Sequence, residues 1–151
     1  MNNIEEPNYL FTIGLDAKTV KGEKHNYLTA IQYQLPHKEV YEHDVFAAQL
    51  RAAGIDDYAC LWAGNCKVPC LNTAGRGAFS TTQVARGKRT VFELLEPEAY
   101  KDKARAEVDA FIAKANRKGM TPCCRPNGTT DKDYGWLIDE YPDIQWYDYT
   151  K

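Results

Sequence analysis

The segment NYLTAIQYQL (residues 26–35) alternates between two sets of side chains along its length. Tyr27, Thr29, Ile31, Tyr33 and Leu35 form one set, and Leu28, Ala30, Gln32 and Gln34 form the other. A period of two is typical of a β-strand, because successive side chains of a strand point to opposite faces of the sheet. We therefore predict a strand here, and a second strand in YLFTIGL (9–15), joined by the polar segment DAKTVKGEKH (16–25).

Two long helices are expected in the middle of the chain. Ser80 is a suitable N-cap for the first, which runs through TTQVARGKRTVFELL (81–95). Pro97 fits the first turn of the second helix, and Gly119 fits the position just beyond its last turn. The second helix carries an apolar stripe made of Tyr100, Ala104, Val108, Phe111, Ile112 and Ala115. Such a stripe is typical of a helix that packs on a core.

The C-terminal part of the chain reads as strand, short helix and strand. GMTPCCR (119–125) and the aromatic-rich DIQWYDYT (143–150) are the strands, and YGWLIDEY (134–141) supplies a helical crossover, which predicts parallel neighbours. HDVFAAQLRAAG (43–54) is a short helix, followed by a structured loop over residues 56–77. The predicted fold class is α/β or α+β, with a mixed sheet paired in parallel in its C-terminal half and helices packed on it, or a partial barrel.

Length and composition limit the class of protein. The 151 residues, 44% hydrophobic and 26% charged, suit one core, so we expect a single domain over residues 1–151. The net charge of -2 provides no global basic field, so binding to nucleic acid would need a local patch. The N-terminal MNNIEEPNYLF lacks the features of a signal peptide, and no apolar run approaches the roughly 20 residues that span a bilayer. We expect a cytoplasmic protein with no membrane partner.

Five cysteines stand out in such a protein. They are Cys60, Cys66, Cys70, Cys123 and Cys124. A reducing cytoplasm disfavours disulfides, whereas the C-x5-C-x3-C spacing of the first three suits a zinc ion or an iron–sulfur cluster, since soft thiolates bind both. Cys124 or its neighbour Cys123 is a candidate fourth ligand, because adjacent strand residues point to opposite faces and only one can reach the metal. The alternative is that the cysteines are buried free thiols.

A basic stretch follows the cysteines. It begins at CLNTAGRG (70–77), and no acidic residue occurs from Leu71 to Phe92. A glycine-rich turn ahead of a helix N-terminus attracts anions, and arginine forks add bidentate contacts to phosphate. The candidate ligand groups here are Asn72, Thr73, Arg76, Arg86 and Arg89. The alternative is that the glycines only permit the turn and the arginines form a solvated face.

The motif RPNGTTD (125–131) directly follows the predicted strand at 119–125. Polar groups at the carboxyl ends of parallel strands commonly bind ligands, which makes candidates of Arg125, Asn127, Thr129 and Asp131. Pro-Asn-Gly is also a turn signal, which is the competing interpretation. We expect this motif and the CLNTAGRG turn to face one common cavity. The acid of the C-terminal WYDYTK, Asp148, would need a partner if it is buried.

Five segments together resemble a known bacteriophage family. They are LDAKTVKGEK (15–24), CLNTAGRG (70–77), QVARGKRTVF (83–92), RPNGTTD (125–131) and YDYTK (147–151). In this order they are similar to the gene product 88-like family, over nearly the whole chain. The resemblance implies a phage origin, a location in the cytoplasm of the infected host cell and a shared site, but it assigns no activity. Family members have Leu in place of Pro126 and continue past YDYTK, so the resemblance implies a shortened member.

Two functions from different classes remain open. The first is an enzyme or enzyme remnant that uses a cysteine-held zinc ion or iron–sulfur cluster to act on a phosphate-bearing small molecule, nucleotide or nucleic acid. The second is a binding protein directed at a host or defence component, in which a metal only stabilises the cysteine loop. No nucleophile and base occur at a recognisable spacing, so the sequence does not separate the two.

Overall fold

The computed structural model describes residues 4–55 and 75–149. Contacts between residues divide the chain into two compact units. The helical unit comprises Met1–Asn8, Gln34–Lys101 and Thr129–Lys132, and the sheet unit comprises Tyr9–Tyr33, Asp102–Gly128 and Asp133–Lys151. The expectation that the chain is a single domain stays a prediction.

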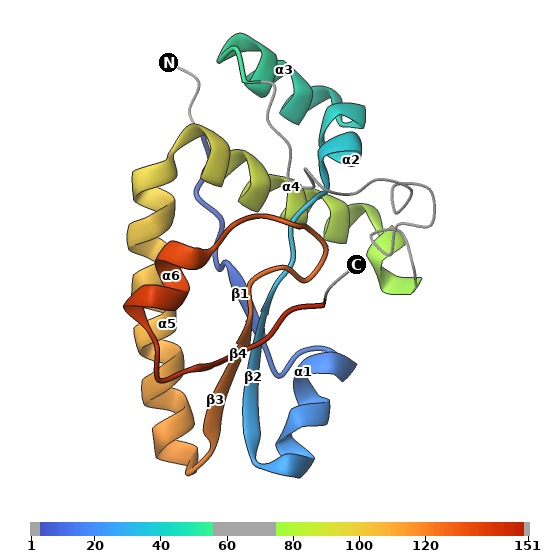
Figure 1. Ribbon diagram of the computed structural model, residues 1–151. Helices are drawn as coiled ribbons and strands as arrows, with labels where there is room; N and C mark the ends of the chain where they lie inside the picture. Colours follow the sequence, from blue (N-terminus) through green and yellow to red (C-terminus); the bar gives the residue numbers. More distant parts are fainter. Residues whose placement is uncertain (1–3, 56–74, 150–151) are drawn as a thin grey trace. The chain divides into compact units, whose positions relative to one another are not determined.

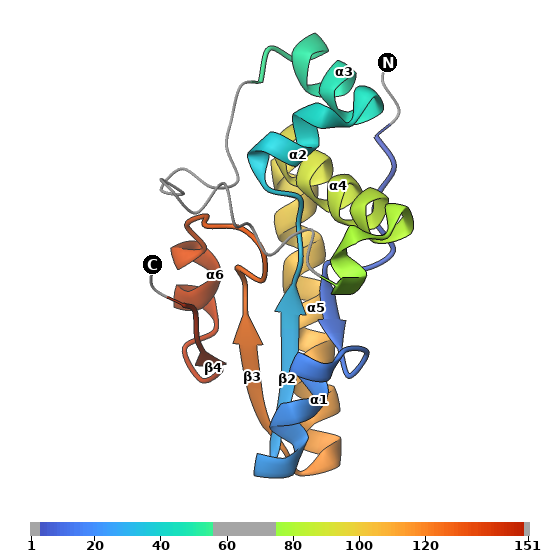
Figure 2. The same cartoon turned by 90° about the vertical axis from the view of Figure 1, so that its right-hand side faces the viewer.

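A four-stranded mixed sheet forms the centre of the sheet unit (Figure 2). In their order across the sheet, the strands are β1 (Phe11–Ile13), β2 (Tyr27–Gln32), β3 (Thr121–Arg125) and β4 (Gln145–Trp146). β1 and β2 are antiparallel, whereas β2–β3 and β3–β4 are parallel, so the predicted mixed sheet and its parallel C-terminal half are confirmed. Within the described residues the sheet ends at β1 and β4 and is not closed into a barrel.

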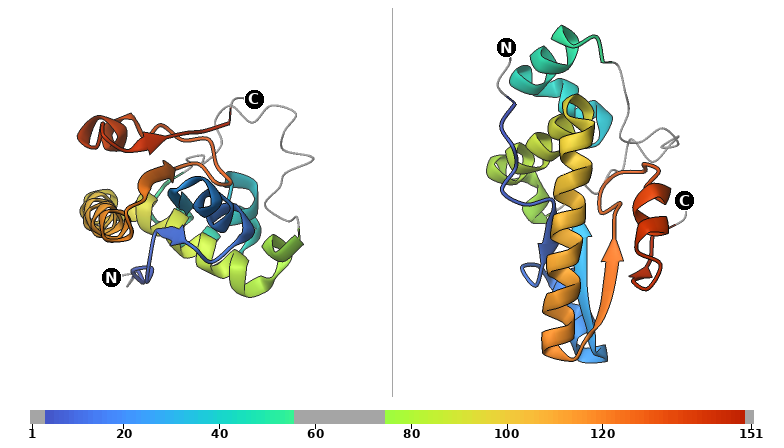
Figure 3. Two further views of the ribbon diagram at one scale, coloured as in Figure 1. Left: turned by 90° about the horizontal axis from the view of Figure 1, so that it is seen from below. Right: turned by 90° about the vertical axis from the view of Figure 1, so that its left-hand side faces the viewer.

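The helix α5 (Pro97–Lys118) lies on one face of this sheet from Asp102 onward. Figures 1 and 3 show α5 running along the strands, with the short helix α1 (Ala17–Lys21) on the opposite face. The predicted stripe on α5 is buried in the sheet unit at Ala104, Val108, Phe111 and Ala115, and Ile112 is half-buried. The apolar stripe of α5 therefore packs on one face of the sheet, as the sequence predicts.

Both ends of α5 lie where the sequence places them. Pro97 is the first residue of the helix, and Gly119, with a φ of 64°, follows its last residue. The carboxylate of Glu107 accepts hydrogen bonds from the backbone N–H groups of Leu10 (2.8 Å) and Phe11 (3.0 Å). This contact holds α5 against the edge strand β1.

The connection between β1 and β2 is helical, which the sequence analysis missed. It contains α1 and the 3-10 helix η1 (Gly22–His25). The carboxylate of Asp16 accepts hydrogen bonds from the N–H groups of Lys18 (2.8 Å) and Thr19 (3.0 Å), and Thr19 Oγ1 accepts one from the Asp16 N–H (3.2 Å). This reciprocal cap stabilises a helix that is too short to show hydrophobic periodicity.

The crossover between β3 and β4 is the predicted short helix, α6 (Gly135–Glu140). The predicted strand over residues 143–150 is longer than the observed β4. The N–H of Tyr147 still donates to the Cys124 carbonyl (3.1 Å), but the next two side chains contact Arg125. At this point the chain leaves the sheet, and Asp148 and Tyr149 contact the last residue of β3.

The helical unit holds the remaining helices. They are α2 (His37–Glu42), α3 (Asp44–Ala52), the 3-10 helix η4 (Gly75–Ala78) and α4 (Ser80–Leu95). α3 corresponds to the helix predicted over residues 43–54, and α2 is an additional one. Ser80 is the first residue of α4, and the N-cap position is held by Phe79 without a side-chain hydrogen bond. The prediction that Ser80 caps this helix is therefore wrong.

The core of the helical unit depends on a close approach of α3 to α4. Its buried cluster consists of Leu35, Val40, Phe46, Leu50 and Val91. A Cβ atom placed on Gly87 of α4 would lie only 2.0 Å from Cε2 of the Phe46 ring. Glycine costs about 1 kcal/mol relative to alanine inside a helix. At Gly87 this cost is offset because the ring packs directly on the helix backbone.

Replacing Gly87 with Ala is expected to lower the free energy of unfolding by about 1–3 kcal/mol, because the added methyl group overlaps the Phe46 ring. Urea unfolding followed by circular dichroism measures the change. In a Phe46→Leu background the same substitution should cost clearly less. A Gly87→Ala variant as stable as the wild type would contradict the contact.

Candidate functional site

A buried polar cluster lies along α4 in the helical unit. The side chains of Arg89, Thr90 and Gln34 are all buried. Thr90 Oγ1 accepts a hydrogen bond from the backbone N–H of Leu35 (2.9 Å), and Gln34 Nε2 donates to the carboxylate of Glu93 (2.5 Å). These bonds join the chain that leaves β2 to the polar side of α4.

The second half of RPNGTTD belongs to the same cluster. Thr129 Oγ1 lies 2.5 Å from the carbonyl oxygen of Gln34, to which it donates, and accepts from the Gln34 N–H (3.1 Å). Lys132 Nζ pairs with Glu93 Oε2 at 3.2 Å, and both side chains are largely buried. The sequence analysis did not assign Gln34, Glu93 or Lys132 to a site, because nothing local marks them as neighbours.

The predicted ligand groups fall into three sets. Arg86, Arg89, Thr129 and Asp131 belong to the helical unit, and Arg125 and Asn127 belong to the sheet unit. Asn72, Thr73, Cys60, Cys66 and Cys70 lie outside the described residues, and so does the side chain of Arg76. The common cavity expected for these groups therefore stays a prediction.

Arg125 brings together two motifs that are far apart in the sequence. It is the last residue of β3 and only 8% exposed. Its Nε pairs with Asp148 Oδ1 at 3.5 Å, and Asn127 Nδ2 donates to Asp148 Oδ2 at 2.8 Å. The guanidinium carbon Cζ lies 4.2 Å from the ring centroid of Tyr149. RPNGTTD and YDYTK thus meet around one buried arginine.

The two Nη atoms form the outer edge of this guanidinium. Within the part of the chain that the structure describes, neither Nη atom of Arg125 donates a hydrogen bond. Asp148 engages only Nε, and Tyr149 covers a face of the guanidinium rather than its edge. Two parallel N–H donors with this geometry match the oxygens of a phosphate or carboxylate. The arrangement can therefore bind an anion.

Gln32 and Gly128 position the loop that follows Arg125. Gln32 is fully buried, and its Nε2 donates to the Pro126 carbonyl (3.2 Å) and to the Tyr134 hydroxyl (2.8 Å). The N–H of Gly128 donates to the Gln32 carbonyl at 2.8 Å. A Cβ on Gly128 would lie 2.4 Å from that oxygen, so the glycine is needed for close approach and not only for a turn.

The cysteines and the tyrosine beside this site are held neutral. Burial raises the pKa of the half-buried Cys123 and, well above its ordinary value, that of the fully buried Cys124. Burial also raises the pKa of Tyr147 to about 12. A metal ligand must be a thiolate, so the burial of Cys124 works against its predicted role, which stays a prediction. Over residues 4–55 and 75–149, no group of three His, Cys, Asp or Glu side chains could hold a metal ion.

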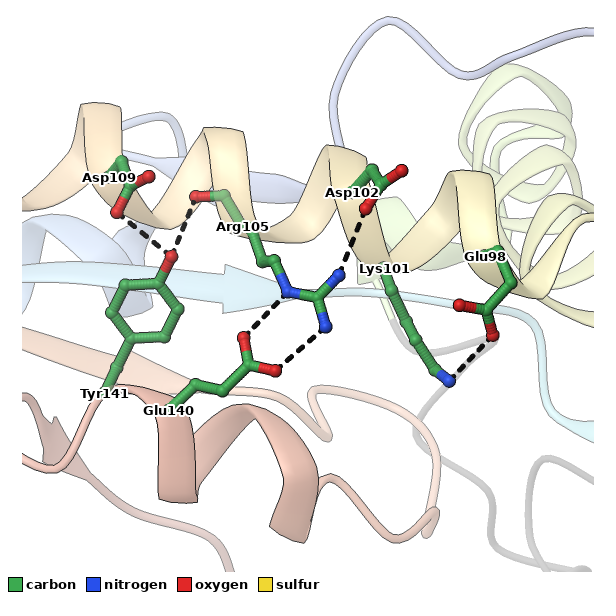
Figure 4. A network of polar contacts seen from close by, with 7 residues as sticks. All are labelled: Glu98, Lys101, Asp102, Arg105, Asp109, Glu140 and Tyr141. Atoms are coloured by element: carbon green, nitrogen blue, oxygen red, sulfur yellow. Dashed lines mark hydrogen bonds and ion pairs between the residues drawn. The ribbon is translucent and has the colours of Figure 1, made fainter.

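A separate polar network fixes α6 against α5 (Figure 4). Arg105 forms a bidentate pair with Glu140 at 2.7 and 2.8 Å and also contacts Asp102 at 3.1 Å. The Tyr141 hydroxyl donates to Asp109 at 3.0 Å, and burial together with this carboxylate raises the pKa of Tyr141 to about 12. Because α6 leads directly into β4, this network helps to place the C-terminal motif beside Arg125.

These features define a small α/β protein with a mixed sheet and one buried arginine at the end of β3, paired with Asp148. The chain belongs to the family described as Gene product 88, whose model matches residues 10–151. The resemblance to the bacteriophage gene product 88-like family is therefore confirmed. No curated protein and no solved structure matches the chain. None of the helices in the described residues is long and apolar enough to cross a membrane.

Replacing Asp148 with Asn is expected to lower the free energy of unfolding by about 1 kcal/mol, because Arg125 loses its charged partner while the half-exposed carboxylate contributes less than a buried one. Thermal unfolding followed by circular dichroism measures the change. Asp143→Asn, which alters an exposed acid of the same unit, should change stability by less than about half of that amount. Equal effects in the two variants would show that the Arg125 contact does not contribute.

Proposed function

We propose that this protein binds a phosphate-bearing ligand, such as a nucleotide or nucleic acid, through Arg125. The observation that supports this is the guanidinium edge described above, on a side chain that is nine-tenths buried and pairs with Asp148. Both Nη groups of the guanidinium are donors that remain available to an acceptor. A phosphate oxygen pair can accept from both.

The surroundings of Arg125 favour recognition through geometry rather than through net charge. Asp148 neutralises the guanidinium, so the pair attracts distant anions weakly. Tyr149 and Asn127 restrict the guanidinium and the carboxylate to one arrangement, which lowers the entropy lost on binding. The affinity for free phosphate should therefore be modest, and a ligand with a larger contact surface should bind more tightly.

The same proposal includes a metal in the cysteine loop. Cys60, Cys66 and Cys70, with Cys124 or Cys123 as a fourth ligand, would hold a zinc ion or an iron–sulfur cluster, on the basis of their spacing. A bound zinc ion would act as a Lewis acid on a phosphoryl oxygen. The protein would then be a metal-dependent enzyme, or the remnant of one. In the competing proposal the metal only stabilises a loop used to bind a host or defence protein.

Substitutions at Arg125 and Asp148 are expected to change phosphate binding in opposite directions. Arg125→Gln should raise the Kd for inorganic phosphate at least about tenfold, because it removes the two Nη donors of the guanidinium. Asp148→Asn should lower the Kd several-fold, because it removes a competing anion. Arg51→Gln, an exposed arginine of the helical unit, is the matched control and should change nothing. Isothermal titration calorimetry with inorganic phosphate and with a nucleoside triphosphate measures both effects.

The opposite signs separate this proposal from a loss of folding. A destabilised variant binds less tightly, so tighter binding by Asp148→Asn cannot arise from unfolding. If both substitutions leave the phosphate Kd unchanged while each variant remains folded, Arg125 does not bind the ligand.

Metal analysis of anaerobically purified protein tests the second part of the proposal. We expect about one equivalent of zinc or an iron–sulfur absorption band in the wild type, and its loss in a Cys60→Ser/Cys66→Ser variant. Cys123→Ser tests the fourth ligand and should lower the metal content only if Cys123 supplies it. An iron–sulfur cluster favours the enzyme, one tight zinc ion with four protein ligands favours the stabilised loop, and wild-type protein without bound metal contradicts both.

A further inference from the structure

Positively charged side chains gather at the amino ends of β2 and β3 in the sheet unit. The parallel register pairs Tyr27 with Thr121, so the residues that precede the two strands meet at one edge of the sheet. The N–H of Thr121 donates to the Asn26 carbonyl at 2.9 Å, and Asn26 Nδ2 donates to the Gly119 carbonyl at 3.3 Å. Figure 1 shows the α1–η1 segment and the end of α5 at this same end of the sheet.

We call this surface the basic edge. It consists of Lys18, Lys21, Lys24, His25, Arg117 and Lys118, all exposed. In the described chain none of the six forms an ion pair. Asp16, which caps α1, and Glu23 are the acids nearest to them in the first segment, and none occurs from Ala110 to Thr130 in the second. The basic edge therefore carries an excess of positive charge although the whole chain has a net charge of -2.

Helix stability explains only a part of this charge. Cations near a helix C-terminus interact favourably with the helix dipole, which accounts for Arg117 and Lys118 on α5. Lys18 and Lys21 also lie in the last turn of α1, and Lys24 in that of η1, but these helices are short, and the dipole does not explain why three helix ends meet at one edge. Like charges brought together without partners reduce stability, so their convergence indicates an anionic partner.

An aromatic side chain lies at the same edge. Tyr27 is the first residue of β2 and is 38% exposed, whereas all the later residues of that strand are buried. Tyrosine beside lysine and arginine is the combination with which proteins bind single-stranded nucleic acid, because the ring stacks on a base while the cations contact phosphates. A membrane surface or an acidic protein would use the cations but would not require the ring.

We propose that the basic edge binds single-stranded nucleic acid, with its lysines and arginine on the phosphates and Tyr27 stacked on a base. This surface is separate from the Arg125 site, which lies at the other end of β3, about 13 Å away at 3.3 Å per residue. The inference therefore goes beyond the proposed function and does not depend on it. It also identifies a local patch of the kind that a protein with a negative net charge needs for binding nucleic acid.

The test measures fluorescence anisotropy with a labelled single-stranded oligonucleotide of about 20 nucleotides, at several salt concentrations. A Lys24→Ala/Lys118→Ala variant should bind about tenfold more weakly than the wild type at low salt. The slope of log K against log salt should fall by about 1.4, which is 0.7 for each of two phosphate contacts. The matched control, Arg51→Ala/Lys101→Ala, removes the same charge from the helical unit and should leave both quantities near the wild-type values.

Two further variants identify the partner and the site. Tyr27→Ala should weaken binding about tenfold without changing the salt slope, because stacking releases no counterions. Lys21→Ala/Arg117→Ala, a second pair on the basic edge, should weaken binding and lower the salt slope as Lys24→Ala/Lys118→Ala does, because it also removes two phosphate contacts. All the altered side chains of the basic edge are exposed, so circular dichroism should confirm that these variants fold.

Several results would overturn this inference. Equal losses in the Lys24/Lys118 variant and its control would mean that only net charge matters. Duplex binding tighter than single-strand binding, with no effect of Tyr27→Ala, would exclude stacking. Binding to vesicles with anionic lipids but not to the oligonucleotide would assign the surface to a membrane. A wild-type protein that binds no oligonucleotide at low salt would also reject it.

Discussion

The parallel pairing of β2 with β3 is the interaction on which both ends of the sheet unit depend. Its register runs from Tyr27–Thr121 to Ile31–Arg125 and joins segments separated by most of the chain. Parallel strands need a long connection, and here the connection contains α2, α3, α4 and α5. The pairing is therefore non-local. It brings the residues of the basic edge together at the amino ends of the strands, and it places Arg125 at the carboxyl end of β3. Neither surface exists in either strand alone.

At the carboxyl end, one buried amide extends the pairing beyond the last strand residues. Gln32 uses both hydrogens of Nε2, one to Pro126 and one to Tyr134, while its backbone carbonyl accepts from Gly128. A buried amide without such partners would cost about 1–3 kcal/mol, so these bonds fix the conformation of the PNG turn. This turn sets the position of the Asn127 side chain beside Asp148. The geometry at Arg125 thus rests on a residue that shows in the sequence only as one member of an alternating strand.

The elements that the sequence predicts well are those with a strong local signal. Period-two alternation marks β2, and the apolar stripe, Pro97 and Gly119 mark α5. α1 is missed because five residues carry no period and its stability comes from the Asp16–Thr19 cap. The ion pair between Arg125 and Asp148 was also not predictable from the local sequence, because it follows from the register of β3 with β4, which a helical crossover separates. RPNGTTD could be identified from the sequence as a candidate site. Its division between the two units could not, because it depends on distant partners: Thr129 bonds to Gln34 in the helical unit, and Asn127 bonds to Asp148 in the sheet unit.

The two ends of the β2–β3 pair differ in how far their charge acts. At the carboxyl end, Asp148 compensates Arg125, so the fork acts only on a ligand in contact with it. At the amino ends, the cations are exposed and have no ion pairs within the described residues, so their field extends over a Debye length of about 8 Å at physiological salt. An anionic polymer would be attracted first by the basic edge, and that step weakens as salt rises. A small phosphate ligand would depend on the Arg125 fork, whose partly buried geometry is screened less. The two proposed modes of anion binding at this strand pair would therefore be separated by ionic strength.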